Sequence, residues 1–287
     1  MQTIPIRLAL VLAASLQPCV AAPPETARSF VTSDHVRLHW QEAGPPAGHT
    51  VLFVPGLAMP GWIWAPQIHD LSRHYHVAAL DPRGQGQSDV PETGYDPMRR
   101  GQDIAEMIGQ LGPGPVTIVA WSLGVLDTLD YLHTHGDQRV AGLVLVDNSV
   151  GEDPAPVPLP HPAHPAPTQP YAVSMRAFVH GLFQHPQDPA WLDRLSRASL
   201  SLQEAAARAL RAYPLPRTYW KEAVYATERP VLYVVRPRWA AQADNLARNR
   251  PGTETAIFTT AGHALFVDEP ARFNALLEDF IRRRIWP

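Results

Sequence analysis

Residues 116–126 read VTIVAWSLGVL and place a serine between two different patterns. The residues before Ser122 form an apolar run typical of a buried strand, and those after it repeat apolar side chains at helical spacing. A serine at such a sharp turn can act as a nucleophile if the residues two before and two after it are small. Gly124 meets this condition, and Ala120 adds only a methyl group where glycine is usual. A serine that merely caps the following helix is the alternative.

A nucleophilic serine needs a base, and His263 is the candidate among the 13 histidines. It stands in TTAGHALFVDEP, between the last predicted strand and the closing predicted helix. This position suits the chain order nucleophile, acid, histidine. The pairs His74/His76 and His133/His135 are two residues apart and do not share a helix face. We therefore expect no metal site from them.

The elements that must position these residues alternate along most of the chain. A hairpin is predicted around Ser33-Asp34, and buried strands are predicted at 51–54, 77–80, 116–120, 140–146, 231–235 and 254–259. Helices are predicted within 61–73, 97–112, 122–133, 241–249 and 271–284. Continuous apolar strands that alternate with helices are typical of a parallel sheet covered on both faces. The sequence therefore predicts an α/β fold with a mostly parallel sheet flanked by helices.

The alternation stops between residues 151 and 230. This stretch begins with GEDPAPVPLPHPAHPAPTQP, whose prolines favour an extended strap, and continues with helical segments rich in aromatic residues. We interpret 151–230 as an inserted strap and helical cap, and 23–150 together with 231–287 as the α/β core.

The N-terminus has the pattern of a secretory signal peptide. Arg7 precedes the apolar stretch LALVLAASL, which is too short to span a bilayer, and the small residues Ala21 and Ala22 follow. We predict a signal peptide over residues 1–22 and a secreted or periplasmic mature protein. Pro18 precedes Cys19 where a small residue is expected, which argues against a lipid anchor there. Cys19 is the only cysteine, so the mature chain has neither a disulfide nor a thiol nucleophile.

The composition and net charge limit the classes of molecule that this protein is expected to bind. The 287 residues are 45% apolar and 18% charged, a balance that suits a sizeable globular core. The formal net charge of −3 offers no basic field for nucleic acid and no reason to expect a stable membrane partner. We expect a small-molecule substrate, and the oligomeric state stays open.

Four segments, in this order and spacing, resemble the α/β-hydrolase fold family. They are VPGLAMPGWIWAPQI at 54–68, DPRGQGQSD at 81–89, VAWSLG at 119–124 and AGHALFVDEP at 261–270. The resemblance covers roughly residues 30–150 and 230–287. It implies an α/β-hydrolase fold in which Ser122 is the nucleophile and His263 the general base. In this family the DPRGQGQSD segment shapes a loop and does no chemistry.

One departure concerns the third member of the triad. Most relatives place the acid after the strand that reads VLYVV here, but this chain has Arg236-Pro237-Arg238-Trp239 at that point. The first carboxylate that follows is Asp244, several residues into a predicted helix.

The family has a second location for the acid, at the end of the strand one βα unit after the nucleophile. Asp147 occupies that end in GLVLVDNS, and an acid there can orient the histidine and stabilise its cation. We take Asp147 as the candidate; Asp244, Glu152, Asp153 and a missing acid stay open as alternatives. An Asp147 that only caps the next turn is the structural alternative.

The resemblance also implies an oxyanion hole made of the backbone N–H groups of Leu57 and Leu123. The expected activity is cleavage of a carboxylic ester that has an apolar part, through an acyl-enzyme, with no metal or cofactor. A perhydrolase, a lactonase or a carbon–carbon bond hydrolase would use the same triad. A non-catalytic binding protein of the same fold is the alternative from a different class.

Overall fold

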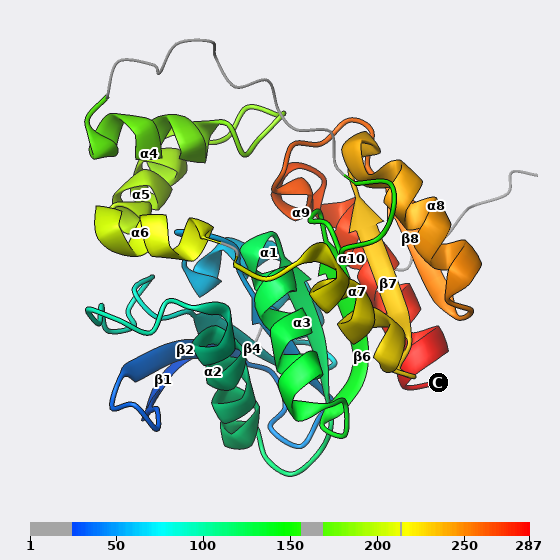
Figure 1. Ribbon diagram of the computed structural model, residues 1–287. Coiled ribbons are helices and arrows are strands. Elements are labelled where there is room, and N and C mark those ends of the chain that lie inside the picture. The colour runs from blue at the N-terminus through cyan, green and yellow to red at the C-terminus, as the bar shows by residue number, and fades with distance from the viewer. Residues whose placement is uncertain (1–24, 156–168, 213) are drawn as a thin grey trace, which may run out of the picture.

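The computed structural model describes residues 25–155, 169–212 and 214–287 (Figure 1). Its centre is an eight-stranded sheet in the order β1-β2-β4-β3-β5-β6-β7-β8. β1 and β2 form an antiparallel hairpin, β2 is antiparallel to β4, and the remaining neighbours are parallel. The predicted mostly parallel sheet flanked by helices is confirmed. The predicted signal peptide and most of the proline-rich strap lie outside the described residues.

The strands carry few polar residues in the middle of the sheet. Their bounds are β1 Thr26–Val31, β2 Arg37–Ala43, β3 Thr50–Val54, β4 His76–Asp81, β5 Val116–Trp121, β6 Val140–Val146, β7 Val231–Val235 and β8 Thr253–Ile257. Every residue of β3, β4, β5 and β7 is buried. Burial on both faces explains why these segments read as continuous apolar runs.

Helices cover both faces of the sheet. Their bounds are α1 Ala65–Leu71, α2 Pro97–Gln110, α3 Leu123–His135, α8 Ala240–Asn249, α9 Leu265–Asp268 and α10 Pro270–Phe280, with short turns of helix at η1 Gly61–Trp64, η2 Pro237–Trp239 and η3 Ile281–Ile285. Side chains alternate along β5. Val119 and Trp121 join the core beneath α1 and α10, whereas Ile118 and Ala120 join the core beneath α2 and α3.

Four helices lie between β6 and β7 in the chain: α4 Tyr171–His180, α5 Pro189–Ser199, α6 Glu204–Arg211 and α7 Arg217–Ala226. The first three form a group away from the sheet (Figure 1). α7 instead packs against α3, where Trp220 and Val224 enter the core of that face. The segment that the sequence predicts as a single cap is therefore divided, because the apolar side of α7 completes the core.

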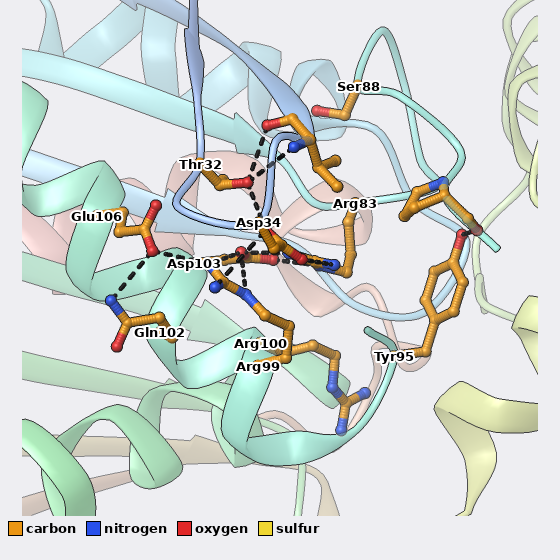
Figure 2. Close-up of polar contacts among 12 residues, drawn as sticks. Thr32, Asp34, Arg83, Ser88, Tyr95, Arg99, Arg100, Gln102, Asp103 and Glu106 are labelled. Atoms are coloured by element: carbon orange, nitrogen blue, oxygen red, sulfur yellow. Dashed lines mark hydrogen bonds and ion pairs between the residues drawn. The ribbon is translucent and has the colours of Figure 1, made fainter. Parts of the chain in front are cut away.

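The segment DPRGQGQSD is held by buried ionic contacts. Arg83 is 1% exposed and its guanidinium lies 2.5 Å from Asp103 of α2 and 3.0 Å from Asp34 in the β1–β2 turn (Figure 2). Asp81 accepts hydrogen bonds from the backbone N–H groups of Gly61 and Gln87 at 2.6 and 2.8 Å. These contacts tie the loop to α2 and to the turn after β3.

No helix in the described ranges is long and apolar enough to cross a membrane.

Candidate active site

Ser122 lies at a strained turn between β5 and α3. Its backbone has φ 56° and ψ −121°, a conformation that L-residues rarely adopt and that surrounding structure must hold in place. Its side chain makes no capping hydrogen bond to α3, so the helix-cap alternative is wrong. The methyl group of Ala120 is fully buried in the core, which shows that this turn accommodates it.

Two glycines make room for this turn. A Cβ atom on Gly56 would lie 2.8 Å from the Cβ of Ser122. A Cβ atom on Gly124 would lie 2.7 Å from the carbonyl oxygens of Val54 and Pro55. Both distances are shorter than any normal contact, so neither position tolerates a side chain without a backbone shift.

His263 follows β8 and its ring reaches Ser122. Nε2 of His263 lies 2.8 Å from Oγ of Ser122, and Nδ1 lies 2.6 Å from Oδ2 of Asp147. The indole N–H of Trp121 donates to the carbonyl of His263 at 2.9 Å and fixes the backbone of the histidine. A ring that donates from Nδ1 to the carboxylate leaves Nε2 free to accept the serine proton.

Asp147 stands directly after β6, with a positive φ of 50°. Its backbone N–H donates to the carbonyl of Val234 at 2.9 Å, and its side chain is fully buried. The carboxyl ends of β5, β6 and β8 meet at one edge of the sheet, which brings Asp147, Ser122 and His263 together.

The other carboxylates that the sequence left open lie elsewhere. Asp244 is exposed on α8, and its side chain has no hydrogen bond among the described residues. Glu152 is buried and accepts a hydrogen bond from Lys221 of α7 at 2.8 Å. Asp153 is exposed and lies 3.4 Å from the same lysine.

Arg236 is a neighbour of Asp147 that the sequence did not predict. Its backbone N–H donates to Oδ1 at 2.9 Å and its Nε donates to Oδ2 at 2.6 Å. Burial by itself would raise the pKa of Asp147. The hydrogen bond and charge of His263, together with the charge of Arg236, outweigh burial and hold this pKa below its usual range. The position of Arg236 directly after the predicted strand at 231–235 was the feature of the sequence that could have indicated this contact.

Asn148 was also not predicted. Its side-chain amide N–H donates to the backbone carbonyl of Ser122 at 2.8 Å. Its backbone carbonyl accepts a hydrogen bond from the hydroxyl of Tyr233 at 2.7 Å. The residue after Asp147 therefore braces the turn that holds Ser122.

Leu57 and Leu123 lie on either side of the serine turn, and both side chains are buried. Leu57 follows Pro55-Gly56 after β3, and Leu123 is the first residue of α3. Within the described part of the chain, no acceptor is found for either backbone N–H. Two such free donors beside a nucleophile are what an oxyanion requires.

A cavity of about 590 Å³ opens onto these residues. We call it the Ser122 cavity, and it is lined by Ser122, Asp147, Asn148, Ala177, Phe178, Gly181, Leu182, Arg236, Arg238, Trp239 and His263. The turn after α4 is tied to the segment around His263, because the N–H of Ala264 donates to Leu182 at 2.9 Å and that of Gln184 donates to Asp268 at 2.7 Å. Within the residues described, no cluster of three or more His, Cys, Asp and Glu side chains could hold a metal ion.

Comparison with known proteins decides the family. The sequence model of the Alpha/beta hydrolase family matches residues 51–276, which is most of the chain. The protein belongs to this family. The match takes in the strand before Leu57, the serine turn, Asp147 and His263, as well as the helices between β6 and β7.

Three relatives illustrate the range of described activities in this family. The 2-(acetamidomethylene)succinate hydrolase of Mesorhizobium japonicum is 32% identical over 112 residues, which cover 39% of each chain. The "putative carbamate hydrolase RutD" of Caulobacter vibrioides is 28% identical over 268 residues, or 86% of this chain and 94% of that one. A "putative aryl esterase" of Burkholderia cenocepacia has a crystal structure with a TM-score of 0.78 and 26% identity; 90% of this chain and 98% of that chain are covered. These likenesses support a hydrolase.

Proposed function

We propose that the protein is a serine hydrolase that cleaves carboxylic esters through an acyl-enzyme. The observation that carries the proposal is the 2.8 Å distance between Ser122 Oγ and His263 Nε2 at the floor of a cavity large enough for a small ester. A serine hydroxyl is a weak nucleophile at neutral pH, and a neutral imidazole within hydrogen-bond reach activates it.

The reaction has two halves. Ser122 Oγ attacks the ester carbonyl while His263 Nε2 takes its proton, and the resulting oxyanion accepts hydrogen bonds from the N–H groups of Leu57 and Leu123. His263 then returns the proton to the departing alcohol, which leaves an acyl group on Ser122. Water attacks the acyl-enzyme by the same route, and the acid and free Ser122 are released.

Asp147 has the role of the orienting acid in this proposal. A carboxylate 2.6 Å from Nδ1 keeps the proton of the neutral ring on that nitrogen, so that Nε2 faces the serine as an acceptor. It also stabilises the imidazolium formed during each half of the reaction. The low pKa of Asp147 keeps it ionised across the pH range in which a hydrolase of this kind works.

The relatives support chemistry at a carbonyl carbon. A carbamate and an aryl ester, named in the descriptions of two of them, are both carbonyl compounds. The apolar side chains Phe178, Leu182 and Trp239 in the Ser122 cavity favour an ester with an apolar part. We also propose export from the cytoplasm, on the pattern of residues 1–22.

Labelling with a fluorophosphonate tests the nucleophile, and hydrolysis of 4-nitrophenyl esters tests the reaction. We expect labelling of the wild type and none of Ser122→Ala, with kcat reduced by roughly three orders of magnitude or more. His263→Ala should lose nearly as much, and the double variant should be no worse than either single one, because the two residues act as a unit. Ser201→Ala, at an exposed serine in the turn after α5, is the control. A Ser122→Ala protein with activity within tenfold of wild type would remove the proposal.

A further inference from the structure

The charges on the wall of the Ser122 cavity do not balance. Its lining contains three side chains with a permanent charge: Asp147, Arg236 and Arg238. Asp147 and Arg236 form an ion pair at 2.6 Å and offset each other. Among the Asp, Glu, Lys and Arg side chains of the lining, the positive charge of Arg238 is therefore the one that no carboxylate offsets.

Arg238 has no carboxylate partner among the described residues. Its guanidinium instead lies over the indole of Trp239, with Cζ 4.9 Å from the ring centroid. A stacked guanidinium keeps its N–H donors in the plane of the fork, where they can bind a carboxylate in a bidentate way. The side chain is therefore held by its neighbour while its donors remain available.

Arg238 lies in the lining of the cavity that contains Ser122 and His263. It belongs to η2, two residues after Arg236, whose Nη2 lies 3.4 Å from Nδ1 of His263. Trp239, on which Arg238 stacks, lines the same cavity as Ser122. A cavity of about 590 Å³ holds small acyl compounds, so a group bound by Arg238 and a carbonyl at Ser122 can belong to one molecule.

We propose that the preferred substrates are esters that carry a free carboxylate, such as half-esters of dicarboxylic acids, and that Arg238 binds this carboxylate. The inference rests on the proposed ester hydrolysis and names the substrate class for the same site. Apolar side chains of α4 and the turn after it contact the carbon chain, and the guanidinium binds its charged end. Arg238 is exposed, so added salt screens this ion pair.

The test compares two esters that differ only in this charge. 4-Nitrophenyl pentanoate and mono-4-nitrophenyl glutarate have the same leaving group and the same acyl chain length. We expect the wild type to favour the glutarate in kcat/KM by about tenfold or more, mainly through a lower KM. A tenfold preference corresponds to about 1.4 kcal/mol. Arg238→Gln should lower the glutarate-to-pentanoate ratio at least tenfold, and Arg238→Glu should reverse the preference.

Arg194→Gln is the matched control. Arg194 is also exposed and also stacked on an indole, that of Trp62 at 4.3 Å, but it does not line the Ser122 cavity. This variant should keep the wild-type ratio. Added salt should reduce the preference in the wild type and have little effect in Arg238→Gln.

The outcomes separate this inference from the proposed function. If Arg238→Gln leaves the glutarate-to-pentanoate ratio of kcat/KM unchanged, whether or not both activities fall, the carboxylate site is overturned while ester hydrolysis stands. If the wild type cleaves neither ester, ester hydrolysis fails, and the site is judged by calorimetry of monomethyl glutarate with Ser122→Ala. Binding to Ser122→Ala that is lost in the double variant Ser122→Ala/Arg238→Gln supports the site. If monomethyl glutarate does not bind to Ser122→Ala, the site is overturned.

Discussion

Arg236 and His263 share one carboxylate oxygen of Asp147. Oδ2 lies 2.6 Å from Arg236 Nε and 2.6 Å from His263 Nδ1, while Oδ1 accepts the backbone N–H of Arg236 at 2.9 Å. The arginine directly follows β7, and it holds the carboxylate of Asp147, which directly follows β6. Both carboxylate oxygens are therefore fixed before a substrate binds.

Asp147→Asn is expected to lower kcat by about three to four orders of magnitude with little change in KM. An amide can donate to Nδ1, which places the ring proton on Nε2 and removes the acceptor for the serine hydroxyl. Steady-state kinetics on a 4-nitrophenyl ester measures this effect.

The matched control is Asp244→Asn, which removes the same charge from an exposed position on α8. It should leave kcat within about twofold of wild type. Near-normal turnover in Asp147→Asn would show that this carboxylate does not orient His263.

Arg83→Met should lower the free energy of unfolding by about 3 kcal/mol, because it leaves the buried Asp103 without one of its partners (Figure 2). Urea denaturation measures the loss. Arg197→Met breaks an exposed ion pair with Asp193 and should cost no more than about 1 kcal/mol. Equal losses in the two variants would mean that the contacts of Arg83 do not hold the loop.

Asp127 makes stability depend on pH. Burial raises its pKa to about 7, the charges of Asp130 and Asp103 add to this effect, and Arg100 at 3.3 Å opposes it. The unfolded chain has a pKa of about 3.9, so the folded protein binds more protons between the two values and stability falls as pH rises through that range.

Asp127→Asn removes this titration. Relative to wild type, the variant should gain stability on the order of 4 kcal/mol as pH rises from about 4 to about 8. Urea denaturation at several pH values measures the difference. A difference that stays constant with pH would show that Asp127 is ionised throughout.

Export predicts a mature protein that begins near Ala22 or Pro23. This prediction rests on the short apolar stretch LALVLAASL and the small residues that follow it. Intact-mass measurement of protein recovered from outside the cytoplasm checks the cleavage site. A retained Met1, or a diacylglyceryl group on Cys19, would contradict simple secretion.

Local patterns in the sequence determined most of the sheet. The strands predicted at 51–54, 116–120, 140–146 and 231–235 agree with β3, β5, β6 and β7 to within one residue. Long apolar runs can be read this way because a strand buried on both faces needs an apolar side chain at nearly every position. The turn at Ser122 was also expected from neighbours in sequence, since the small residues that it requires lie within two positions of it.

The tertiary structure alone decided what depends on contacts between distant segments. Asp147, Arg236 and His263 come from the ends of three strands that are far apart in sequence, and only the parallel pairing of β6, β7 and β8 brings them together. The division of α7 from α4, α5 and α6 is of the same kind. All four helices have apolar positions at helical spacing, but whether those positions face the sheet or one another depends on the surface that each helix meets, and no local pattern contains that information.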